Sequence, residues 1–548
     1  MLKQISHTGG VTDVDEILFA TPFGYMFPEL AHSSECLLPP GQDTTRALIA
    51  LGRAMAMDEG GSGSDPLASD VSSVFTYFGQ FIDHDLTART DRETEVSEIF
   101  APDGSAQPVV PRDPDEVALM LKNGRRAQFD LDNAYGDGPG LLNDSAGVPV
   151  PGSATEAQAL YDSDLKFKLQ TVGPAIDLHR PKSTAEGYRP NERVALIADG
   201  RNDENINVSQ FHAAILAYHN CIMDGLAAFG VTGPTAFVRA RQYVRWTYQY
   251  LVVEEYLKTV CLPDVVSDVL RNGPYFYGAV AGGQPLFMPL EFSVAAFRFG
   301  HSMVRSSYEM RNGTLTIGGI LGVSSPDRKG NPDILKAPGS PAADNAYCLI
   351  EDFTVDWSKF FGSGAPNKAR KIDPMIAKGL GTLTFVGGSS VMAHLAARNL
   401  LRGFSLGIPT GQAAAAACGI QPLSPDEIRN GEDAGIREVL DASSFAQRTP
   451  LWYYILREAA VQTDGQRLGV VGSRIVAECM IGLLKKDPNS YLNQYGIARN
   501  ITKEGIDVPT KDGRKTIGSL EAFLNAAGVY PQGHHCVSHG RKRGRLFS

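Results

Sequence analysis

Residues 79–86 place polar and charged side chains inside an otherwise apolar helical pattern. At about 100° per residue, Gln80 and His84 share one helix face, and Asp83 lies beside them. Asp85 projects about 100° away from His84, toward different neighbours. A neutral imidazole can take a proton from one substrate atom and return it to another near pH 7. The segment therefore predicts acid–base chemistry, although a single histidine on an apolar helix is more often a hydrogen-bonded core residue.

A second charged cluster, residues 201–205, directly precedes a predicted helix at residues 207–226. The guanidinium of Arg201 would stay charged in a dry pocket and would stabilise negative charge on a leaving oxygen. The alternative is a surface loop of mixed charge. His212 and His219 lie seven residues apart, near one face of the same helix, and we interpret them as structural.

An acidic loop carries Asp130 and Asp132 at alternating positions, so an extended backbone would point both carboxylates to one side. Calcium binds about six to eight oxygen atoms from carboxylates, hydroxyls and carbonyls. Asp85 and the backbone oxygens near Arg126 and Gln128 would add to such a set. An acidic turn without a metal is the alternative.

The elements that must position these side chains are mainly helical. Apolar residues that recur with the helical period predict helices at residues 71–86, 207–226, 238–261, 292–305, 376–400 and 473–484. Strand signals are few, and residues 314–321 are expected to form a short hairpin arm. Clusters of Gly and Pro mark long loops, as at residues 136–140 and 338–341. We therefore expect a mainly α protein with one large helical domain, long irregular loops and very little β structure.

Composition narrows the class of protein. The chain has 548 residues, of which 43% are hydrophobic and 20% are charged, which is ordinary for a globular protein. A net charge of -10 argues against a general nucleic-acid partner. No apolar run reaches the roughly 18–20 residues that span a bilayer, and residues 1–10 lack the apolar core of a secretory signal. We expect a soluble chain without a classical export signal, and its compartment stays open.

The seven cysteines are scattered and form no Cys-x-x-Cys pair, which argues against a disulfide framework and a zinc site. We expect an N-terminal arm at residues 1–60, a catalytic domain at 61–500 and a C-terminal segment at 501–548 that packs on the domain. The last segment carries a basic run at residues 541–545, either a mobile tail or an anchor to an anionic surface.

The pattern Gln-x-x-Asp-His-Asp at residues 80–85 is similar to the distal-helix signature of the animal haem peroxidases, within the peroxidase–cyclooxygenase superfamily. The resemblance implies that His84 takes the proton of hydrogen peroxide and that Gln80 hydrogen-bonds in the distal pocket. It also implies that Asp83 can form an ester with a haem methyl and that Asp85 binds calcium.

The spacing Arg-x-x-Glu at residues 201–204 resembles the family's distal Arg and its second ester-forming Glu, here Glu204. Some members carry a Met after this Glu, which makes a sulfonium link to haem. This chain has Asn205 there, so the resemblance allows two esters and no sulfonium, and it puts chloride oxidation in doubt. The family's calcium loop begins with a Thr hydroxyl, where this chain has Arg126.

Residues 297–301 resemble the family's proximal segment, in which the histidine, here His301, binds the haem iron. Asn399 and Arg402 match the family's partner of that histidine and a propionate partner, and Asn399 as an ordinary helix residue is the alternative. Cyclooxygenases and α-dioxygenases place a radical-forming Tyr three residues before the proximal histidine. This chain has Arg298 there, as in the peroxidase branch, and a cation disfavours an apolar fatty-acid channel.

These motifs follow the family's order over residues 77–411. The resemblance implies a haem peroxidase that reduces hydrogen peroxide and oxidises a phenolic or aromatic donor, or iodide, bromide or thiocyanate, through an oxyferryl intermediate. Its cofactors would be haem b, with ester links to Asp83 and Glu204 as an option, and calcium. The alternatives are a fatty-acid dioxygenase of the same superfamily and a non-catalytic haem-binding protein. The donor and the oligomeric state are not predicted.

Overall fold

The computed structural model describes residues 2–5, 11–14, 21–56, 68–91, 109–144, 147–152, 156–181, 192–280, 286–325, 331–337, 346–381, 383, 391 and 393–530. The loop at residues 338–341, the basic run at residues 541–545 and Cys536 lie outside this part of the chain. The division of the chain at residues 60 and 500 stays a prediction.

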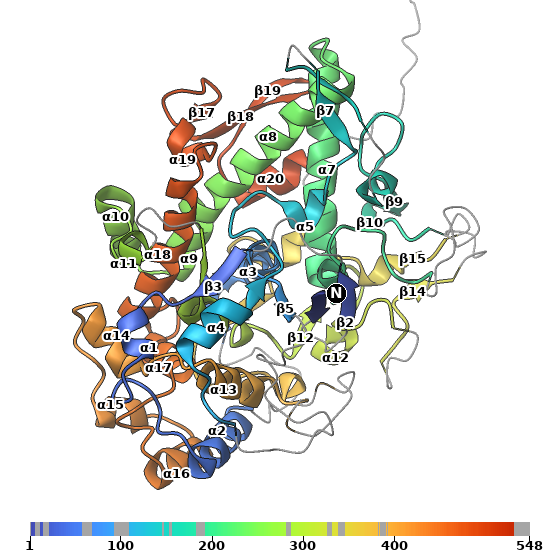
Figure 1. The fold of residues 1–548 in the computed structure, drawn as a ribbon. Helices are drawn as coiled ribbons and strands as arrows, with labels where there is room; N and C mark the ends of the chain where they lie inside the picture. Colours follow the sequence, from blue (N-terminus) through green and yellow to red (C-terminus); the bar gives the residue numbers. More distant parts are fainter. Residues whose placement is uncertain are drawn as a thin grey trace, which may run out of the picture.

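The centre of the fold is α3 (Val74–Leu86), whose side chains are buried on nearly every side. A helix that is apolar all round belongs in the core. The long helix α7 (Ile206–Ala228) packs against α3 and against the neighbouring α8 (Gly233–Leu251). Figure 1 shows α7 and α8 side by side above α3. The prediction of a mainly helical protein is confirmed.

Two predicted helices have irregular backbones. The helix expected at 238–261 begins at Gly233, widens into a π-helix at Val252–Leu257 and ends at Val260. The helix expected at 292–305 is a π-helix at Glu291–Ala295 followed by a 3-10 helix at Ala296–His301. Periodicity alone cannot distinguish these forms, and π-helical turns are frequent at functional sites. Both irregular segments contribute side chains to the cavity described below.

The helix expected at residues 376–400 is wrong over the described residues before Leu395. A short 3-10 turn lies at Lys378–Leu380, and the helix α13 begins only at Leu395 and ends at Ser405. Glycines at positions 379, 381, 387 and 388 interrupt the apolar pattern. Glycine disfavours helix because it loses the most backbone freedom on folding.

Short strands connect the helices. The hairpin expected at residues 314–321 is half right, because β13 (Thr314–Thr316) pairs with β12 (Ser307–Glu309) but Ile317–Ile320 is a helical turn. The largest sheet has the order β11 (Met288–Pro289), β3 (Thr21–Gly24), β6 (Lys122–Asn123), β5 (Arg89–Asp91), β1 (Leu2–Ile5) and β2 (Val11–Val14).

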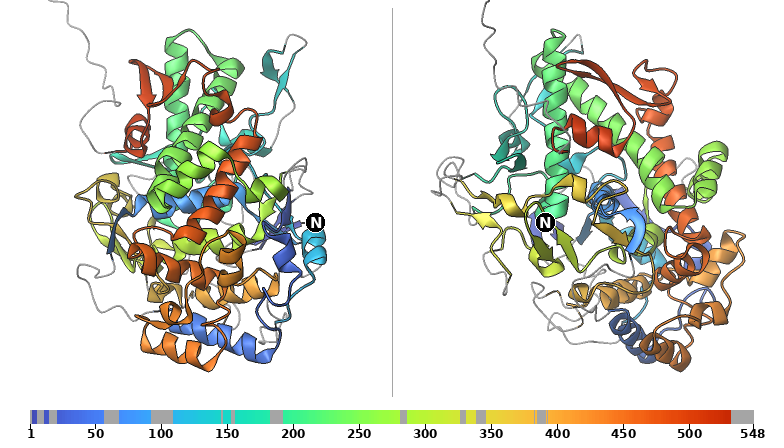
Figure 2. Two further views of the ribbon diagram at one scale, coloured as in Figure 1. Left: turned by 90° about the vertical axis from the view of Figure 1, so that its left-hand side faces the viewer. Right: turned by 180° about the vertical axis from the view of Figure 1, so that it is seen from behind.

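A second group of helices lies below α3 in the view of Figure 1 and contains α13, α2 (Gln42–Ala54) and α17 (Leu451–Thr463), and α18 (Val470–Lys486) packs on α17. Figure 2 shows the blue α2 and the orange helices together at the lower end of the molecule. At the other end, β18 (Gly505–Thr510), β19 (Gly513–Ile517) and α20 (Leu520–Ala526) follow one another, and β18 and α20 pack on α7. These groups share one continuous hydrophobic core.

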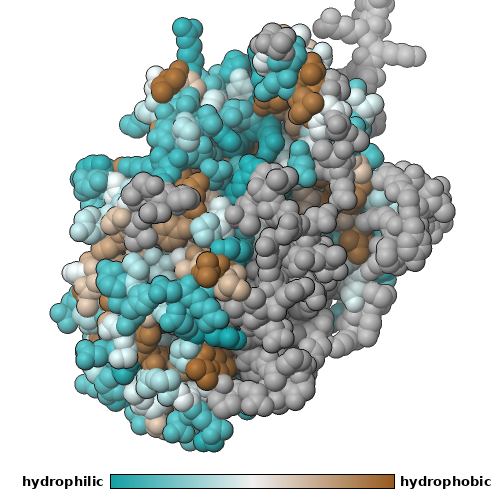
Figure 3. Space-filling model, viewed as in Figure 1, coloured by the Kyte–Doolittle hydropathy of each residue, from teal (hydrophilic) through white to brown (hydrophobic). Residues whose placement is uncertain are grey.

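The face in Figure 3 is mainly hydrophilic, with apolar side chains scattered between polar ones. Among the helices in the described part of the chain, none has both the length and the hydropathy needed to cross a bilayer. The six described cysteines are all free thiols.

Candidate functional site

A cavity lies between the central helix α3 and the irregular segment that ends at His301. Its wall combines apolar and aromatic side chains with a few polar groups. The polar and histidine side chains in the wall include Gln80, Asp83, Glu204, Asn205, Arg298 and His301. The apolar part includes Phe75, Tyr256, Phe297, Met303, Ile320, Leu383 and Leu395.

Segments far apart in the sequence meet here at close range. A side chain at Gly79 would collide with the hydroxyl of Tyr256, whose oxygen lies 2.4 Å from the position of an added Cβ. Only glycine therefore allows α3 to approach the π-helix so closely. That approach brings Tyr256 and Phe75 together, with 6.5 Å between their ring centroids.

His301 closes the 3-10 segment on one side of the cavity. Its Nδ1 lies 2.8 Å from the Nδ2 atom of Asn399 on α13, and Trp452 on α17 packs edge-on at 6.4 Å between ring centroids. Asn399 therefore lies where the sequence expects the partner of this imidazole. Iron ligation by Nε2 requires Nδ1 to keep its proton, so a half-turn of the amide would then present the Asn399 oxygen to Nδ1.

Arg298 links the two walls of the cavity. Its Nη1 donates to Oδ2 of Asp83 at 2.8 Å, and its Nε donates to the carbonyl of Ser293 at 2.7 Å. Asp83 Oδ1 accepts a second hydrogen bond from the hydroxyl of Thr87 at 3.0 Å. The pair thus joins the helix that carries His84 to the segment that carries His301.

Gln80 lines the cavity and is held by Asn205. The Nδ2 atom of Asn205 donates to Oε1 of Gln80 at 2.9 Å. Asn205 also caps α7, because its Oδ1 accepts from the backbone N–H of Val208 at 2.9 Å. Glu204, the preceding residue, is half-buried in the same wall.

His84 lies one helical turn beyond Gln80 and is fully buried. It is absent from the residues that line the cavity, although its helix neighbours Gln80 and Asp83 are present. Its Nδ1 lies 2.8 Å from Oδ1 of Asn202. As oriented, that oxygen accepts from Nδ1–H, which makes Nε2 the nitrogen with a lone pair.

Arg201 does not line the cavity. Its guanidinium donates to the carbonyls of His84 at 2.8 Å and Thr87 at 2.7 Å, and it pairs with the buried Asp199. An arginine suits the end of a helix, where the last carbonyls lack partners. The structure therefore places Arg201 against the backbone of His84, whereas the sequence predicts a cation that stabilises charge on a leaving oxygen. Arg402 is half-buried on α13 and is also absent from the cavity wall.

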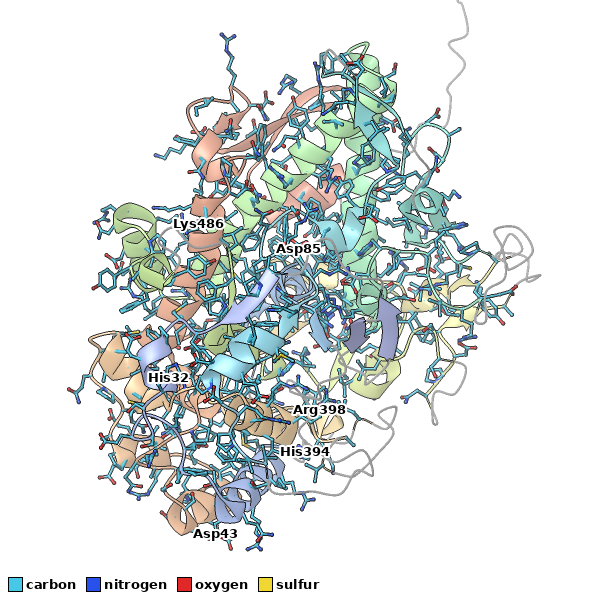
Figure 4. The ribbon with its side chains drawn as sticks, viewed as in Figure 1. His32, Asp43, Asp85, His394, Arg398 and Lys486 are labelled. Carbon is cyan, nitrogen blue, oxygen red and sulfur yellow. The ribbon has the colours of Figure 1, made fainter. Side chains whose placement is uncertain are left out.

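Three carboxylates converge on the other side of α3. Oxygen atoms of Asp85, Asp130 and Asp132 all lie within 4.8 Å of one another. Burial raises the pKa of Asp132 to about 7, and burial with the neighbouring carboxylates raises that of Asp85 well above its usual range. Figure 4 shows Asp85 deep in the interior, whereas His32 and Asp43 lie at the periphery. A divalent cation would reverse the mutual repulsion of these groups.

The acidic loop reaches this arrangement by a different backbone from the one expected. Leu131 is left-handed with φ 62°, so the alternation of an extended strand does not apply. Its side chain is fully buried, and the turn brings Asp130 and Asp132 together. Arg126 lies 3.4 Å from Asp130 through its Nη1, and its carbonyl accepts from the N–H of Gln128 at 2.8 Å. The backbone oxygens near Arg126 and Gln128 stay predicted calcium ligands.

His212 and His219 are fully buried in α7 and do not line the cavity. The hydroxyl of Tyr135 lies 2.9 Å from Nδ1 of His219. Burial lowers the pKa of His212 to about 4 and that of His219 to about 3, so both are neutral at pH 7. Neutral, buried imidazoles fit the structural role expected for them.

The sequence analysis missed three side chains at the site, which are Asn202, Asn205 and Trp452. Each contacts a predicted residue through a bond or ring contact that crosses between elements. Asn202 and Asn205 stand beside the predicted Arg201 and Glu204, and an Asn directly before a helix is a capping signal. No sequence signal connects Trp452 with His301.

The family model of the animal haem peroxidases matches residues 156–437, which is more than half of the 548-residue chain. This chain belongs to the animal haem peroxidase family. The matched range includes Glu204, His301 and Asn399, and the distal helix lies before it. Membership in this family implies a haem cofactor.

Curated relatives of this peroxidase family member are distant. The chain is 24% identical over 363 residues to chorion peroxidase of Drosophila melanogaster, which covers 64% of this chain and 41% of that protein. It is 23% identical over 373 residues to thyroid peroxidase of Rattus norvegicus, covering 67% of this chain and 38% of that protein. The chain thus spans about two fifths of the length of these relatives.

Solved structures share the fold across most of the chain. Peroxidase A from Dictyostelium discoideum matches with a TM-score of 0.56 and 16% identity, covering 96% of this chain and 98% of that one. The fatty acid α-dioxygenase of Oryza sativa matches with a TM-score of 0.54 and 12% identity, covering 92% and 77%. At these identities the likeness concerns the fold alone.

Proposed function

We propose that this protein is a haem peroxidase that reduces hydrogen peroxide and oxidises a small donor. The observation that carries the proposal is that His301 and Gln80 line the same cavity, with Asn399 bonded to the imidazole. A histidine with a fixed second partner is a standard protein ligand for haem iron. The largely apolar wall of the cavity suits the faces of a planar macrocycle.

The residues around the cavity fit haem in three respects. His301 would hold the iron, and the apolar side chains would cover the faces of the ring. Arg298 in the wall would neutralise a propionate, for which a planar guanidinium is well suited. Arg402, which lies outside the wall, stays a predicted propionate partner. Bound haem would supply the electrons that break the peroxide O–O bond and would pass the oxidising equivalents to the donor.

The chain's own residues would carry the protons. We infer that His84 takes the proton of one peroxide oxygen at Nε2 and returns it to the other oxygen. The hydrogen bond from Nδ1 to Asn202 supports this role, because it leaves the lone pair on Nε2. Arg201 would act by holding the backbone of His84 in place, through its bond to the His84 carbonyl.

Two further features belong to the same proposal. Asp83 and Glu204 both line the cavity, which supports them as the carboxylates that would form haem esters. Asp85, Asp130 and Asp132 would bind calcium, with backbone oxygens near Arg126 and Gln128 as added ligands. The donor would be a phenol, an aromatic amine, iodide, bromide or thiocyanate, and the apolar wall favours aromatic donors.

The test begins with haem reconstitution of the purified protein, followed by a Soret spectrum and assays with guaiacol, bromide and thiocyanate. The proposal expects a haem-dependent rate that saturates with hydrogen peroxide. After exposure to peroxide, the denatured protein should retain haem in its gel band, and Asp83→Asn with Glu204→Gln should release it. A protein that binds no haem, or binds it without peroxide turnover, contradicts the proposal.

A further inference from the structure

The amide of Asn205 has only one orientation that the surrounding bonds allow. Its Oδ1 accepts from the backbone N–H of Val208 at 2.9 Å, at the first turn of α7. A backbone N–H can only donate, so the oxygen of this amide must face the helix. The Nδ2 atom therefore faces the opposite way, toward α3.

The orientation of Gln80 follows from that of Asn205. The Nδ2 atom of Asn205 lies 2.9 Å from Oε1 of Gln80. An amide N–H₂ can only donate, so Gln80 must turn its oxygen to Asn205 and its own nitrogen away. Gln80 lines the cavity, and no described residue accepts a hydrogen bond from its Nε2.

The nearest carboxylate on the same helix does not compete for this nitrogen. Oδ1 of Asp83 accepts from Thr87, and Oδ2 is paired with Arg298. The amide nitrogen of Gln80 is thus an unused donor in the wall of the cavity. Because unpaired polar groups are costly in a low-dielectric site, the donor adds affinity for a ligand that accepts its hydrogen bond.

We propose that Asn205 is a positioning residue that fixes the polarity of the part of the cavity wall that Gln80 forms. Through Gln80 it presents a hydrogen-bond donor to whatever binds on that side of the haem. The ligands favoured are small anions and molecules with a lone pair on the atom next to the iron. This inference rests on the proposed function, because it needs haem in the cavity.

The decisive variant is Asn205→Asp. A carboxylate of the same shape still caps α7, since Asp is among the best capping residues. It offers an oxygen to Gln80 where Asn205 offers N–H, so Gln80 should turn its amide by half a turn. That rotation is easy, because the last torsion of Gln is broad and nearly two-fold. The acceptor of Gln80 would then face the cavity.

The readout is the affinity of the ferric haem protein for fluoride, measured by optical titration. We expect Asn205→Asp to raise the fluoride Kd by at least about tenfold, the value of a hydrogen bond to a charged ligand. The new negative charge also repels fluoride, so the effect is measured again with Gln80→Met in both backgrounds. The added charge lowers fluoride affinity in both the Gln80 and the Gln80→Met backgrounds. The reversed amide lowers it only in the background that keeps Gln80.

The proposal expects the fold-change in fluoride Kd caused by Asn205→Asp to be several-fold smaller in the Gln80→Met background. Asn205→Ser, which keeps a capping oxygen and removes the N–H, should give a smaller loss of affinity and an unchanged melting temperature. Equal fold-changes in the two backgrounds overturn the proposal, and so does fluoride binding to Gln80→Met as tight as to the wild type. A wild type without a Soret band overturns the proposed function and this inference together, whereas the first two results leave the function standing.

Discussion

Asp83 and Arg298 form an ion pair across the cavity, with 2.8 Å between Oδ2 of the carboxylate and Nη1 of the guanidinium. The two side chains are 7% and 15% exposed. One belongs to the helix of His84, and the other lies three residues before His301. The pair therefore couples the spacing of the two walls, and with it the distance between the predicted acid–base histidine and the predicted iron ligand.

Removing one partner of this pair should be costly. Arg298→Met leaves the Asp83 carboxylate buried without its cation, so we expect the free energy of unfolding to fall by about 3 kcal/mol. Urea denaturation measures the change. The double variant Asp83→Leu with Arg298→Met removes both charges and should recover most of the loss. A double variant as unstable as the single one would contradict a direct interaction.

Alanine variants of His301 and His84 should lose different properties. His301→Ala should lose the Soret spectrum of ligated haem, because it removes the proposed iron ligand. His84→Ala should keep that spectrum and slow the reaction with peroxide by about 10²–10⁴-fold, the usual contribution of acid–base catalysis. Stopped-flow spectroscopy measures the rate. His32→Ala, at a half-exposed position, serves as the control. A normal rate in His84→Ala would refute its role.

Calcium and protons should compete at the acidic cluster. The pKa of Asp132 is raised to about 7 in the fold, chiefly by burial. Without metal, the folded protein holds this proton more tightly than the unfolded chain does. The stability that Asp132 contributes is thus complete below about pH 4 and is lost as the pH rises through about 7.

Calcium should therefore bind weakly below pH 7 and raise the melting temperature most above it. Thermal scans with calcium and with a chelator at pH 5.5 and pH 8 measure the difference. Asp85→Asn should reduce it, and Asp43→Asn, at an exposed position, should not. An equal calcium effect at both pH values would argue against the cluster as the binding site.

The buried Glu458 should make the free energy of unfolding depend on pH. Glu458 accepts from the backbone N–H groups of Val471 and Gly472, and burial raises its pKa to about 7. A raised pKa contributes stability that is complete below the unfolded value of 4.5 and is lost as the pH rises through 7.

Glu458→Gln carries no titrating group. Its free energy of unfolding relative to the wild type should therefore increase by about 1–3 kcal/mol between pH 4.5 and pH 7.5. Paired urea titrations across this range measure the trend. Glu438→Gln, on the exposed side of its helix, should show no trend. A flat difference for Glu458→Gln would mean that this carboxyl titrates normally.

The chain should not oxygenate fatty acids through a tyrosyl radical. Arg298, three residues before His301, is paired with Asp83 and cannot form such a radical. Oxygen electrode traces with linoleate and an activating amount of peroxide should show no sustained uptake. Tyr308 is fully buried and hydrogen-bonded to the backbone N–H of Arg305, so Tyr308→Phe should change little. A defined hydroperoxide product at a rate rivalling phenol oxidation would favour the dioxygenase alternative.

The sequence predicts the helices that carry the motifs, because buried apolar residues recur about every 3.6 residues along a helix. Residues 71–86 and 207–226 illustrate this, and both helices appear within a few residues of the expected bounds. The convergence of Asp85 with Asp130 and Asp132 was also predictable, since these residue types suit one kind of ion. The expected backbone of that loop was wrong, because nothing local marks Leu131 as left-handed.

Contacts between distant segments could not be predicted. The bond from Asn205 to Gln80 spans 125 positions, and the pair of Asp83 with Arg298 spans 215. These contacts form only when α3 packs against α7 and against the segment from Glu291 to His301. The spacing of residues in the sequence does not predict that packing. The position of Arg201 has the same origin, because its guanidinium serves carbonyls at the end of another helix.

The walls of the cavity leave the ribosome at different times. At about 5–20 residues per second, His301 is made roughly 10–45 s after Gln80, and Leu395 follows several seconds later. A nascent chain that ends before these positions has one half of the pocket and no ligand for iron. Any macrocycle that the pocket holds must therefore enter after His301 and Leu395 have been made, and its supply would decide how quickly the new chain matures.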